Sequence, residues 1–457
     1  MNFEKKNVLV VGSGKSGVAA VKLLLKAGAN PYLQDGNKEL TEEKLREKTG
    51  PVTVGPGQTI SFIVGDVPEA VKESLDYVVL SPGVPTDSAL VNELRNRGIL
   101  ILGEIELAYA FEKGDVLAIT GTNGKTTTTT LLGEIMKNYA QNTFVVGNIG
   151  NPYTDEVLKT GQSSVTVAEI SSFQLETVNE FAPAVSAVLN ITPDHLDRHH
   201  TMENYVAAKE AIAGKQTKEQ FCVLNYEDEY TRDFANRCKA TPIFFSSAHE
   251  LADGFYYKEE WIYKAADGKA EKLMNIHEMK LLGIHNVENV MAAIAMADAY
   301  QVPMETILDT VRSFKAVEHR IEYVATKNGV DYYNDSKGTN PDAAIKAIQA
   351  MVKPTYLIGG GYDKQSSYDE WIESFDDKVV TLVLLGQTRE KIKECALRHG
   401  FERCVFTDSL EEAVDYCRTH AKEGEAVLLS PACASWGMFS NYEERGNMFK
   451  DMVFAMK

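Results

Sequence analysis

Short apolar runs that end at glycine-bearing turns recur along the chain. Val8–Val11 is rich in β-branched residues and leads into a glycine-rich turn at 12–17, after which the apolar residues of 18–26 repeat with helical spacing. Similar runs at Tyr77–Leu80 and Ile99–Leu102 predict further strands. This alternation of strands and helices predicts a small open α/β sheet that ends near residue 110.

Two further series of predicted strands follow. The second series begins at Val116–Thr120, and helical repeats close it near 286–299 and 304–311. The third series begins near Asp331. The other predicted strands of these series are at 164–170, 184–190, 221–225, 355–358, 379–385 and 426–429. Because 457 residues exceed what one hydrophobic core usually organises, we predict two to four domains of the α/β class.

Composition and charge exclude several classes of protein without indicating a function. Hydrophobic residues make up 44% of the chain and charged residues 25%, which is typical of a globular protein and not of a disordered one. The formal net charge of −18 argues against partners such as nucleic acid or an acidic membrane, because binding to either needs a broad basic surface.

The cysteines and the first apolar run indicate the compartment. The six cysteines are scattered without a CxxC pair, which is typical of reduced thiols rather than of a disulfide framework. The apolar run after Met1–Lys6 stops at Gly12, too early for the core of a signal peptide or for a membrane span. We therefore expect a cytoplasmic protein.

The first glycine-rich turn fits the pattern GxGxxG at Gly12, Gly14 and Gly17. Asp35 lies about where an acidic residue binds a ribose in dinucleotide folds. A tight turn with no ligand is the alternative. We favour a nucleotide or diphosphate ligand, because the amides at a helix N-terminus bind phosphate oxygens.

A second glycine-bearing loop, 121–127, has the sequence Gly-Thr-Asn-Gly-Lys-Thr-Thr between a predicted strand and an apolar helix around Leu131. Its backbone amides can bind phosphate oxygens, Lys125 can neutralise their charge, and the hydroxyl of Thr126 can ligate magnesium. Ile119 stands where the standard phosphate loop has its first glycine. Despite this departure, the context predicts an ATP site rather than a plain turn.

Candidate metal ligands follow two further predicted strands. Glu169 comes directly after the apolar residues 165–168, at the end of the strand beside the phosphate loop, although a helix-capping or solvated glutamate is the alternative. The stretch 190–200 concentrates carboxylates and imidazoles with a spacing unlike that of zinc sites. Acidic groups beside a phosphate loop favour magnesium, to which His195 can add a nitrogen ligand. A purely structural histidine is the alternative.

Lys209 shares one face of a predicted helix with the apolar residues Tyr205, Ala208 and Ile212. A lysine rarely lies on an apolar face unpaired, although its side chain can also extend along that face to solvent. A buried lysine can lose its proton, and the neutral amine can react with carbon dioxide to give a carbamate that ligates a metal. Carbamylation of Lys209 is therefore a hypothesis to test.

Three loops of the third series, 334–340, 359–364 and 430–435, each follow a predicted strand. The carboxyl ends of parallel strands meet at one edge of an open α/β sheet, where ligands bind. Together the loops are predicted to bind a small carboxylate-bearing substrate and to contact a triphosphate. Earlier in the chain, 285–289 opens a helix with amide side chains that can bind a base or ribose, or cap the helix.

In the content and order of these motifs the chain resembles the Mur ligases over essentially its whole length. The shared segments are 121–127, 168–175, 190–200, Lys209, 285–289, His319-Arg320 and Asp335-Ser336-Lys337. Within the family, 334–340, 430–435 and Arg445-Gly446-Asn447 are similar to the members that add D-glutamate. The resemblance implies a Rossmann-like N-terminal domain at 1–110, a central P-loop ATPase-like domain at 111–315 and a Rossmann-like C-terminal domain at 316–457, which bind a UDP-sugar, ATP and the amino acid.

The resemblance also implies the reaction and its participants. The carboxylate of UDP-N-acetylmuramoyl-L-alanine would attack the γ-phosphate of ATP, and the amine of D-glutamate would then capture the acyl phosphate. ATP and two Mg²⁺ ions would be required, and the third domain would close when ATP binds. The protein would act as a monomer in peptidoglycan precursor synthesis, and hence in cell wall biogenesis, cell division and cell shape.

Site residues follow from the resemblance in five groups. The catalytic residues would be Lys125, Glu169, His195 and Lys209, and the metal ligands Thr126, Glu169, His195 and carbamylated Lys209. The ATP-binding residues would be Gly121, Thr122, Asn123, Gly124, Lys125, Thr126, Thr127, Asn286, Asn289, Arg320, Asp335 and Lys337. The UDP-sugar would contact Gly14, Lys15, Ser16, Asp35, Ser81, Pro82, Gly83 and Asn148, and D-glutamate would contact Thr339, Lys364, Ser435 and Tyr442.

Two positions depart from the family pattern. Gly437 stands where the family usually has an aspartate, and residues 34–37 lack the threonine and arginine expected for uracil recognition. Other functions also remain open: another Mur enzyme or a folylpolyglutamate synthase, a nicotinamide-dependent oxidoreductase built on Gly12–Gly17, and a non-catalytic nucleotide-binding regulator. The second phosphate loop counts against the oxidoreductase, and Glu169 with His195 counts against the regulator.

Overall fold

The computed structural model describes residues 1–315 and 318–456, and within them the strands form three sheets. The chain divides into two compact units. The first unit comprises Met1–Ile276 and Glu288–Val311, and the second comprises His277–Val287 and the chain from Arg312 onward. The prediction of an α/β fold is confirmed.

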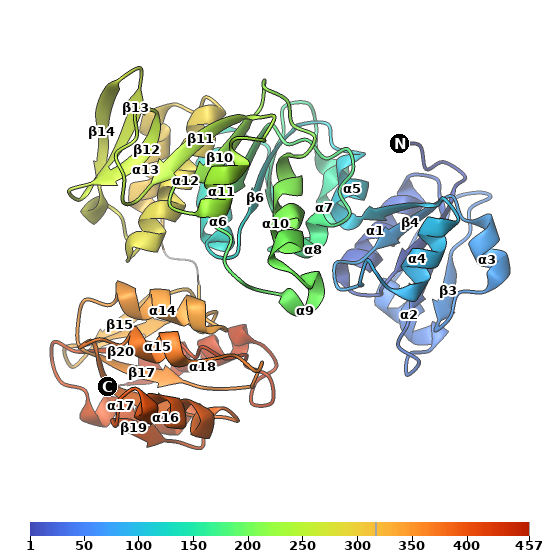
Figure 1. The fold of residues 1–457 in the computed structure, drawn as a ribbon. Helices are drawn as coiled ribbons and strands as arrows, with labels where there is room; N and C mark the ends of the chain where they lie inside the picture. Colours follow the sequence, from blue (N-terminus) through green and yellow to red (C-terminus); the bar gives the residue numbers. More distant parts are fainter. Residues whose placement is uncertain (316–317, 457) are drawn as a thin grey trace. The chain divides into compact units, whose positions relative to one another are not determined.

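The N-terminal sheet is parallel, with strand order β3-β2-β1-β4-β5 (Figure 1). Its strands are β1 (Asn7–Val11), β2 (Asn30–Asp35), β3 (Ser61–Val64), β4 (Tyr77–Leu80) and β5 (Leu100–Gly103). Its helices are α1 (Lys15–Lys26), α2 (Glu42–Thr49), α3 (Glu69–Ser74), α4 (Ala89–Asn96) and α5 (Glu104–Tyr109). The strand, turn and helix predicted at 8–26 are present, with α1 starting at Lys15 rather than 18. An added Cβ on Gly17 would lie 1.9 Å from the carbonyl oxygen of Gly12, so the approach of helix to strand requires this glycine.

The central sheet has the strand order β14-β13-β12-β11-β10-β9-β6-β8-β7 and is parallel from β7 to β12. Its strands are β6 (Asp115–Thr120), β7 (Thr143–Gly147), β8 (Val165–Glu169), β9 (Val185–Val188), β10 (Phe221–Asn225), β11 (Thr241–Ser246), β12 (Gly254–Lys258), β13 (Trp261–Ala266) and β14 (Lys269–Asn275). The helices along this stretch are α6 (Lys125–Tyr139), α7 (Tyr153–Glu156), α8 (Ser172–Leu175), α9 (Leu196–His199), α10 (Met202–Glu210), α11 (Glu229–Phe234), α12 (Ile284–Ala299) and α13 (Met304–Ser313). The strands predicted at 116–120, 164–170, 184–190 and 221–225 correspond to β6, β8, β9 and β10, and β7 and β11 to β14 are additional. Of these, β13 and β14 are antiparallel.

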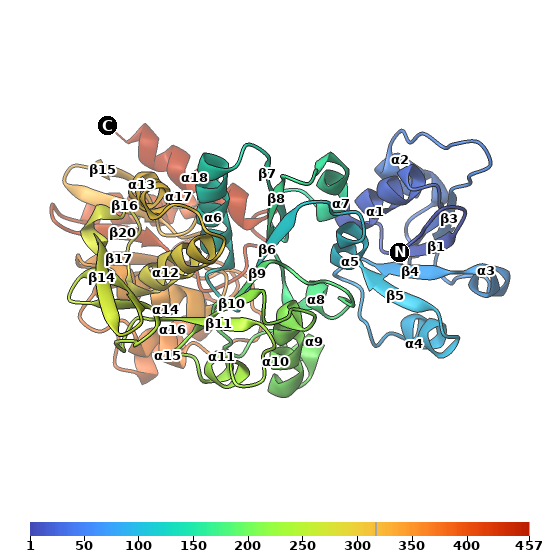
Figure 2. The same cartoon turned by 90° about the horizontal axis from the view of Figure 1, so that it is seen from above.

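The two sheets of the first unit share a continuous apolar core. Helix α5 lies between them in Figures 1 and 2, and its residues Ile105, Leu107 and Ala108 are fully buried in that core. Two buried carboxylates on α5 fix the junction: Glu104 accepts from the amide of Thr154 at 2.7 Å, and Glu106 accepts from the amide of Asn179 at 2.8 Å. The junction is therefore packed rather than a loose linker.

The second unit contains a sheet with the strand order β15-β16-β20-β17-β18-β19. Its strands are β15 (Glu322–Lys327), β16 (Val330–Asn334), β17 (Thr355–Gly359), β18 (Val379–Leu384), β19 (Cys404–Phe406) and β20 (Ala426–Leu429). Its helices are α14 (Pro341–Ala350), α15 (Asp369–Glu373), α16 (Arg389–Arg398), α17 (Leu410–His420) and α18 (Tyr442–Ala455). The neighbours β16, β20 and β17 are parallel, so the loops after them meet at one edge, as predicted.

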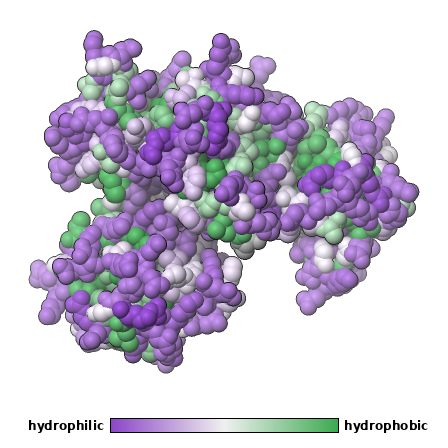
Figure 3. All heavy atoms as spheres, viewed as in Figure 1, coloured by the Kyte–Doolittle hydropathy of each residue, from purple (hydrophilic) through white to green (hydrophobic). Residues whose placement is uncertain are grey.

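Surface character agrees with the composition. The face seen in Figure 3 is mostly hydrophilic, with hydrophobic residues in small groups, as expected for a chain with a net charge of −18. Among the described residues, no helix combines the length and the apolar character that a membrane span requires.

Candidate functional site

The phosphate loop joins β6 to α6 in a tight turn. Gly124 has φ +85°, and an added Cβ there would lie 2.1 Å from the side-chain oxygen of Asn289, so the turn accepts only glycine. The loop is anchored by Asn190, whose side chain accepts from the amide of Asn123 at 2.8 Å. The first residue of α6 is Lys125, so its amides open toward the loop, as an anion site requires.

Lys125 folds back over this loop. Its Nζ donates to the carbonyl oxygens of Gly121 and Thr122, both at 2.9 Å. Thr126 and Thr127 follow it in the first turn of α6, and Thr127 is buried. The loop residues predicted to bind ATP therefore lie together at one helix N-terminus, with Asn289 beside them.

Glu169 is the last residue of β8, next to β6, and is 1% exposed. Its Oε1 accepts from the side-chain amide of Asn148 at 2.7 Å. Its Oε2 is buried without a hydrogen-bond partner among the described residues. A buried carboxylate oxygen in that state is costly unless a cation binds it, so Glu169 fits a metal ligand and not a solvated glutamate.

Lys209, on α10, is 1% exposed, and its Nζ donates to the carbonyl oxygen of Gly121 at 2.7 Å. The side chain therefore does not extend to solvent. Burial lowers the pKa of Lys209 well below its usual value, the positive charge of Lys125 lowers it further, and Asp194 opposes both effects. The neutral amine that carbamate formation needs is thus favoured at the phosphate loop.

The histidines of 190–200 divide into two kinds. His195 has φ 53° and a side chain that is 50% exposed, and its ring centroid lies 4.9 Å from that of Phe173. His199 is buried and hydrogen-bonded to the hydroxyl of Ser172 at 3.0 Å. Arg198 pairs with Glu176 at 2.7 Å. His200 is also exposed, with Nε2 3.1 Å from Oδ2 of Asp87. His195 and His200 are therefore the accessible imidazoles, and the contacts of His199 and Arg198 hold the loop in place.

The N-terminal residues predicted to contact a UDP-sugar surround the first glycine-rich turn. The backbone amide of Ser13 donates to Asp35 Oδ2 at 3.0 Å, and the hydroxyl of Ser81 donates to the carbonyl oxygen of Gly12 at 3.0 Å. The turn, the end of β2 and the loop after β4 are thus brought together, and they carry the predicted contacts Gly14, Lys15, Ser16, Asp35, Ser81, Pro82 and Gly83. Asn148 is not near this turn in sequence: it follows β7 of the central sheet, and its side chain is hydrogen-bonded to Glu169.

In the second unit, Asp335 directly follows β16 and is fully buried at the edge of the sheet where the predicted loops meet. Its Oδ1 accepts from the amide of Ile321 at 3.2 Å, and its Oδ2 accepts from the hydroxyl of Ser430 at 2.7 Å. Burial raises the pKa of Asp335 to about 6, although the charge of Arg320 and the hydrogen bond from Ser430 oppose this. Lys337 follows, with its Nζ 5.4 Å from the ring centroid of Tyr442.

Arg445 joins two of the predicted loops, a role that the sequence motif did not reveal. It is 2% exposed, and it donates to the hydroxyl of Ser336 at 2.9 Å and to the carbonyl oxygens of Ser336 at 2.8 Å and Cys433 at 3.4 Å. Burial lowers its pKa to about 10. The buried guanidinium therefore fixes loop 334–340 against loop 430–435.

The remaining candidates lie around these loops. Ser435 is buried in loop 430–435, and the carbonyl oxygen of Tyr442 accepts from the hydroxyl of Ser336 at 2.8 Å. Thr339 is partly exposed in the turn after Lys337, and Lys364 is exposed. Asn286 is buried in the first turn of α12 and donates to the carbonyl oxygen of Leu282 at 2.7 Å, which ties the helix to the residues before it.

Family models match the chain in three consecutive parts. The models described as Mur ligase MurD-like N-terminal domain, Mur ligase middle domain, and Mur ligase glutamate ligase domain match residues 6–103, 119–297 and 319–433. These parts carry the first glycine-rich turn, the phosphate loop and most of the third group of loops.

Individual proteins match over the full length. UDP-N-acetylmuramoylalanine–D-glutamate ligase of Lachnospira eligens is 58% identical, with 99% of each chain covered, and that of Thermoanaerobacter pseudethanolicus is 47% identical, with 100% of each covered. Among solved structures, UDP-N-acetylmuramate–alanine ligase of Thermotoga maritima is 19% identical with a TM-score of 0.61, covering 99% of this chain and 100% of that one. At that identity the structural likeness supports the fold alone.

Proposed function

The chain belongs to the Mur ligase family, and from this membership we propose that it is an ATP-dependent ligase which joins D-glutamate to UDP-N-acetylmuramoyl-L-alanine. The observation that carries the proposal is identity of 58% over 454 residues to a ligase of that name. The products would be the D-glutamyl dipeptide of the UDP-sugar, ADP and phosphate. Its place would be in peptidoglycan precursor synthesis, and so in cell division and cell shape.

The first chemical step is phosphoryl transfer to the substrate carboxylate. Lys125 and the amides of loop 121–127 would hold the phosphates of ATP, with Asn289 at the loop and Asn286, Arg320, Asp335 and Lys337 as further nucleotide contacts. Negative charge builds on the phosphate oxygens in this step, so fixed positive groups lower the barrier mainly by position and electrostatics. The carboxylate oxygen would form a bond to the γ-phosphorus, and the bond from that phosphorus to the β,γ-bridging oxygen would break to give an acyl phosphate and ADP.

The residues present fit magnesium. The unpartnered Oε2 of Glu169 supports a cation there, and we propose Thr126, Glu169, His195 and carbamylated Lys209 as the protein ligands of two Mg²⁺ ions. When bound, Mg²⁺ would neutralise charge on the phosphates. In forming the carbamate, the neutral Nζ of Lys209 would bond to the carbon of CO₂ and lose a proton, which converts a potential positive charge into a negative ligand.

The second step is attack by the amine of D-glutamate on the acyl phosphate, with release of phosphate. Thr339, Lys364, Ser435 and Tyr442 are proposed to bind its carboxylates, since exposed Lys364 supplies charge and the hydroxyls supply donors. Gly14, Lys15, Ser16, Asp35, Ser81, Pro82, Gly83 and Asn148 are proposed for the UDP-sugar. We further propose domains at 1–110, 111–315 and 316–457, closure of the third upon ATP binding, a monomeric state and a cytoplasmic location.

The testing experiment is ATP-dependent phosphate release with UDP-N-acetylmuramoyl-L-alanine. D-glutamate is compared with L-glutamate, L-alanine, L-lysine and meso-diaminopimelate as the acceptor. Release with D-glutamate alone is expected. Release with a different acceptor would keep the ligase mechanism but change the substrate, and no release with any acceptor would favour a nucleotide-binding regulator.

A further inference from the structure

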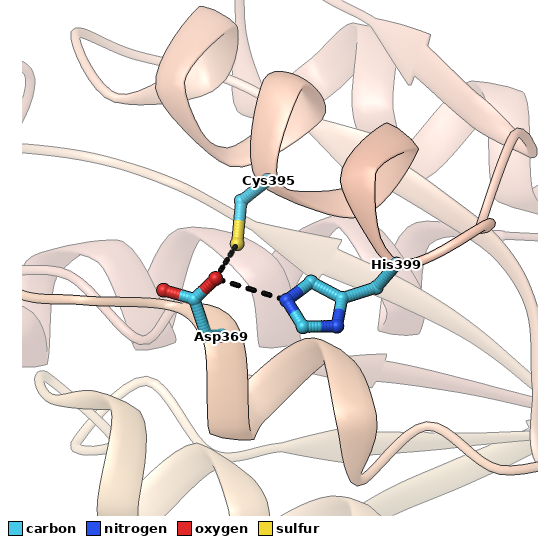
Figure 4. A group of neighbouring side chains, drawn as sticks. All are labelled: Asp369, Cys395 and His399. Carbon is cyan, nitrogen blue, oxygen red and sulfur yellow. Dashed lines mark hydrogen bonds and ion pairs between the residues drawn. The ribbon is translucent and has the colours of Figure 1, made fainter.

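A compact group of metal-ligand side chains lies on the helices α15 and α16. Asp369 begins α15, Cys395 lies in the last turns of α16, and His399 caps that helix (Figure 4). None of the three belongs to the proposed substrate or nucleotide contacts, although Asp369 follows loop 359–364 by five residues. One ligand atom from each residue lies within 4.8 Å of the others. Cys395 and His399 are four residues apart, so they share one helix face toward Asp369.

The spacing of the donor atoms is close to that of a tetrahedral metal site. Oδ1 of Asp369 lies 2.9 Å from Nε2 of His399 and 3.4 Å from Sγ of Cys395. Bond lengths of about 2.0 Å for oxygen and nitrogen and about 2.3 Å for sulfur give ligand separations of roughly 3.3–3.5 Å around tetrahedral zinc. The two separations from Asp369 Oδ1 therefore need to change by only a few tenths of an ångström to admit an ion. The third separation, from Sγ of Cys395 to Nε2 of His399, is within 4.8 Å and has to be about 3.5 Å in the bound state.

Two outer contacts orient the ligands. Nδ1 of His399 lies 3.5 Å from a carboxylate oxygen of Glu373, so the imidazole presents Nε2 inward. Oδ2 of Asp369 accepts from the hydroxyl of Ser367 at 2.6 Å, which leaves Oδ1 for the cluster. Carboxylate–histidine–metal arrangements and hydrogen-bonded carboxylates are the usual supports of protein metal sites.

We propose that Asp369, Cys395 and His399 form a binding site for a thiophilic divalent cation, Zn²⁺, with water as the fourth ligand. Thiolate, imidazole and carboxylate together suit zinc, whereas magnesium prefers oxygen alone. Binding releases the thiol proton of Cys395, and Arg398, whose side chain is 61% exposed and 3.2 Å from Asp369, turns to solvent. Burial and the neighbouring carboxylate raise the pKa of Cys395 to about 11, so affinity increases with pH.

The alternative is a metal-free hydrogen-bonded link between the two helices. A titration with Co²⁺ distinguishes a metal site from such a link. The full-length protein, stripped with a chelator that is then removed, is titrated with Co²⁺ without nucleotide. We expect one equivalent to give a near-ultraviolet thiolate-to-cobalt band that Zn²⁺ abolishes. Absence of the band in the wild-type protein would overturn the proposal.

Matched variants assign the ligands. Cys395→Ser and His399→Gln should each abolish or weaken binding by more than 100-fold, and Glu373→Gln by about 10- to 100-fold. Cys404→Ser, at a half-buried cysteine of the same unit, and Cys238→Ser, in the first unit, should bind as the wild type does. The proposal is overturned if His399→Gln binds Co²⁺ as the wild type does, or if either control cysteine variant loses Co²⁺ binding. Metal-free circular dichroism must match for each variant, and since His399 is at the surface, its variant remains informative if Cys395→Ser misfolds.

Discussion

Lys209 and Lys125 donate hydrogen bonds to the same acceptor, the carbonyl oxygen of Gly121, at 2.7 Å and 2.9 Å. Burial of Lys209, together with the nearby positive charge of Lys125, lowers the pKa of Lys209 well below its usual value. This lowered pKa favours the neutral amine that the proposed carbamate of Lys209 requires. Conversion of Lys209 to a carbamate would turn the repulsion from Lys125 into attraction.

The variant Lys209→Met keeps the length of the side chain but cannot form a carbamate. We expect kcat to fall by about 100-fold or more, as for other losses of a group that stabilises transition-state charge. Steady-state phosphate release checks this, with Lys215→Met as control, because Lys215 is half exposed and pairs only at the surface with Glu180. Removal of CO₂ should also lower wild-type activity, and bicarbonate should restore it. Full activity of the wild type in CO₂-free buffer argues against the carbamate.

The variant Glu169→Gln keeps an oxygen that can accept from Asn148 but replaces the unpartnered Oε2 with an amide. We expect the Mg²⁺ concentration for half-maximal activity to rise at least tenfold (about 1.4 kcal/mol), with little change in thermal stability. The measurement is activity as a function of Mg²⁺ concentration. Glu134→Gln, at an exposed glutamate, is the control. An unchanged requirement in Glu169→Gln would remove this residue from the metal site.

Asp335 should make stability depend on pH. Its folded-state pKa of about 6 lies above the ordinary value of 3.8, so the folded state binds more protons between these values, and the free energy of unfolding falls as pH rises through this window. Relative to Asp335→Asn, the wild type should lose on the order of 3 kcal/mol between about pH 4 and pH 7. Denaturant unfolding of both proteins measures the difference. A difference that is constant with pH contradicts the prediction.

Arg445 should position the acceptor loops rather than take part in the chemistry. Arg445→Lys keeps a charge, but a single ammonium cannot reach both Ser336 and the carbonyl oxygen of Cys433. We expect KM for D-glutamate to rise ~10-fold while KM for the UDP-sugar stays constant. The control is Arg418→Lys, because Arg418 is exposed on α17 and pairs with Asp415 of the same helix. Equal increases in both KM values would indicate general loosening instead.

Much of the fold could be predicted from the sequence where strands are buried on both faces. Tyr77–Leu80, Phe221–Asn225 and Ala426–Leu429 were predicted with the bounds that the structure has, since each is a short apolar run in the middle of a sheet. The strands β13 and β14 were missed because both carry exposed polar residues, and β14 lies at the sheet's edge. The two sheets of the first unit share a core, which a pattern of local elements does not reveal.

The candidate site was predictable to the extent that its chemistry is local. The helical face of Lys209 allowed either burial or extension to solvent, and the structure shows burial. The phosphate loop followed from its glycines between a strand and a helix. The roles of His199 and Arg445 depend on partners far away in the chain, Ser172 and Cys433 among them, or on packing that spacing does not encode. The predicted domain boundaries and substrate contacts stay predictions.

The place of β20 between β16 and β17 governs when the second unit can form during synthesis. β20 follows β16, β17, β18 and β19 in chain order, yet it supplies the pairing that joins β16 to β17. A nascent chain that has not yet emerged past Leu429 leaves both neighbours with open hydrogen-bonding edges, the kind of surface that aggregates. The emerging β16 must therefore wait for translation of about a hundred further residues, while the first unit's sheets are already available to fold.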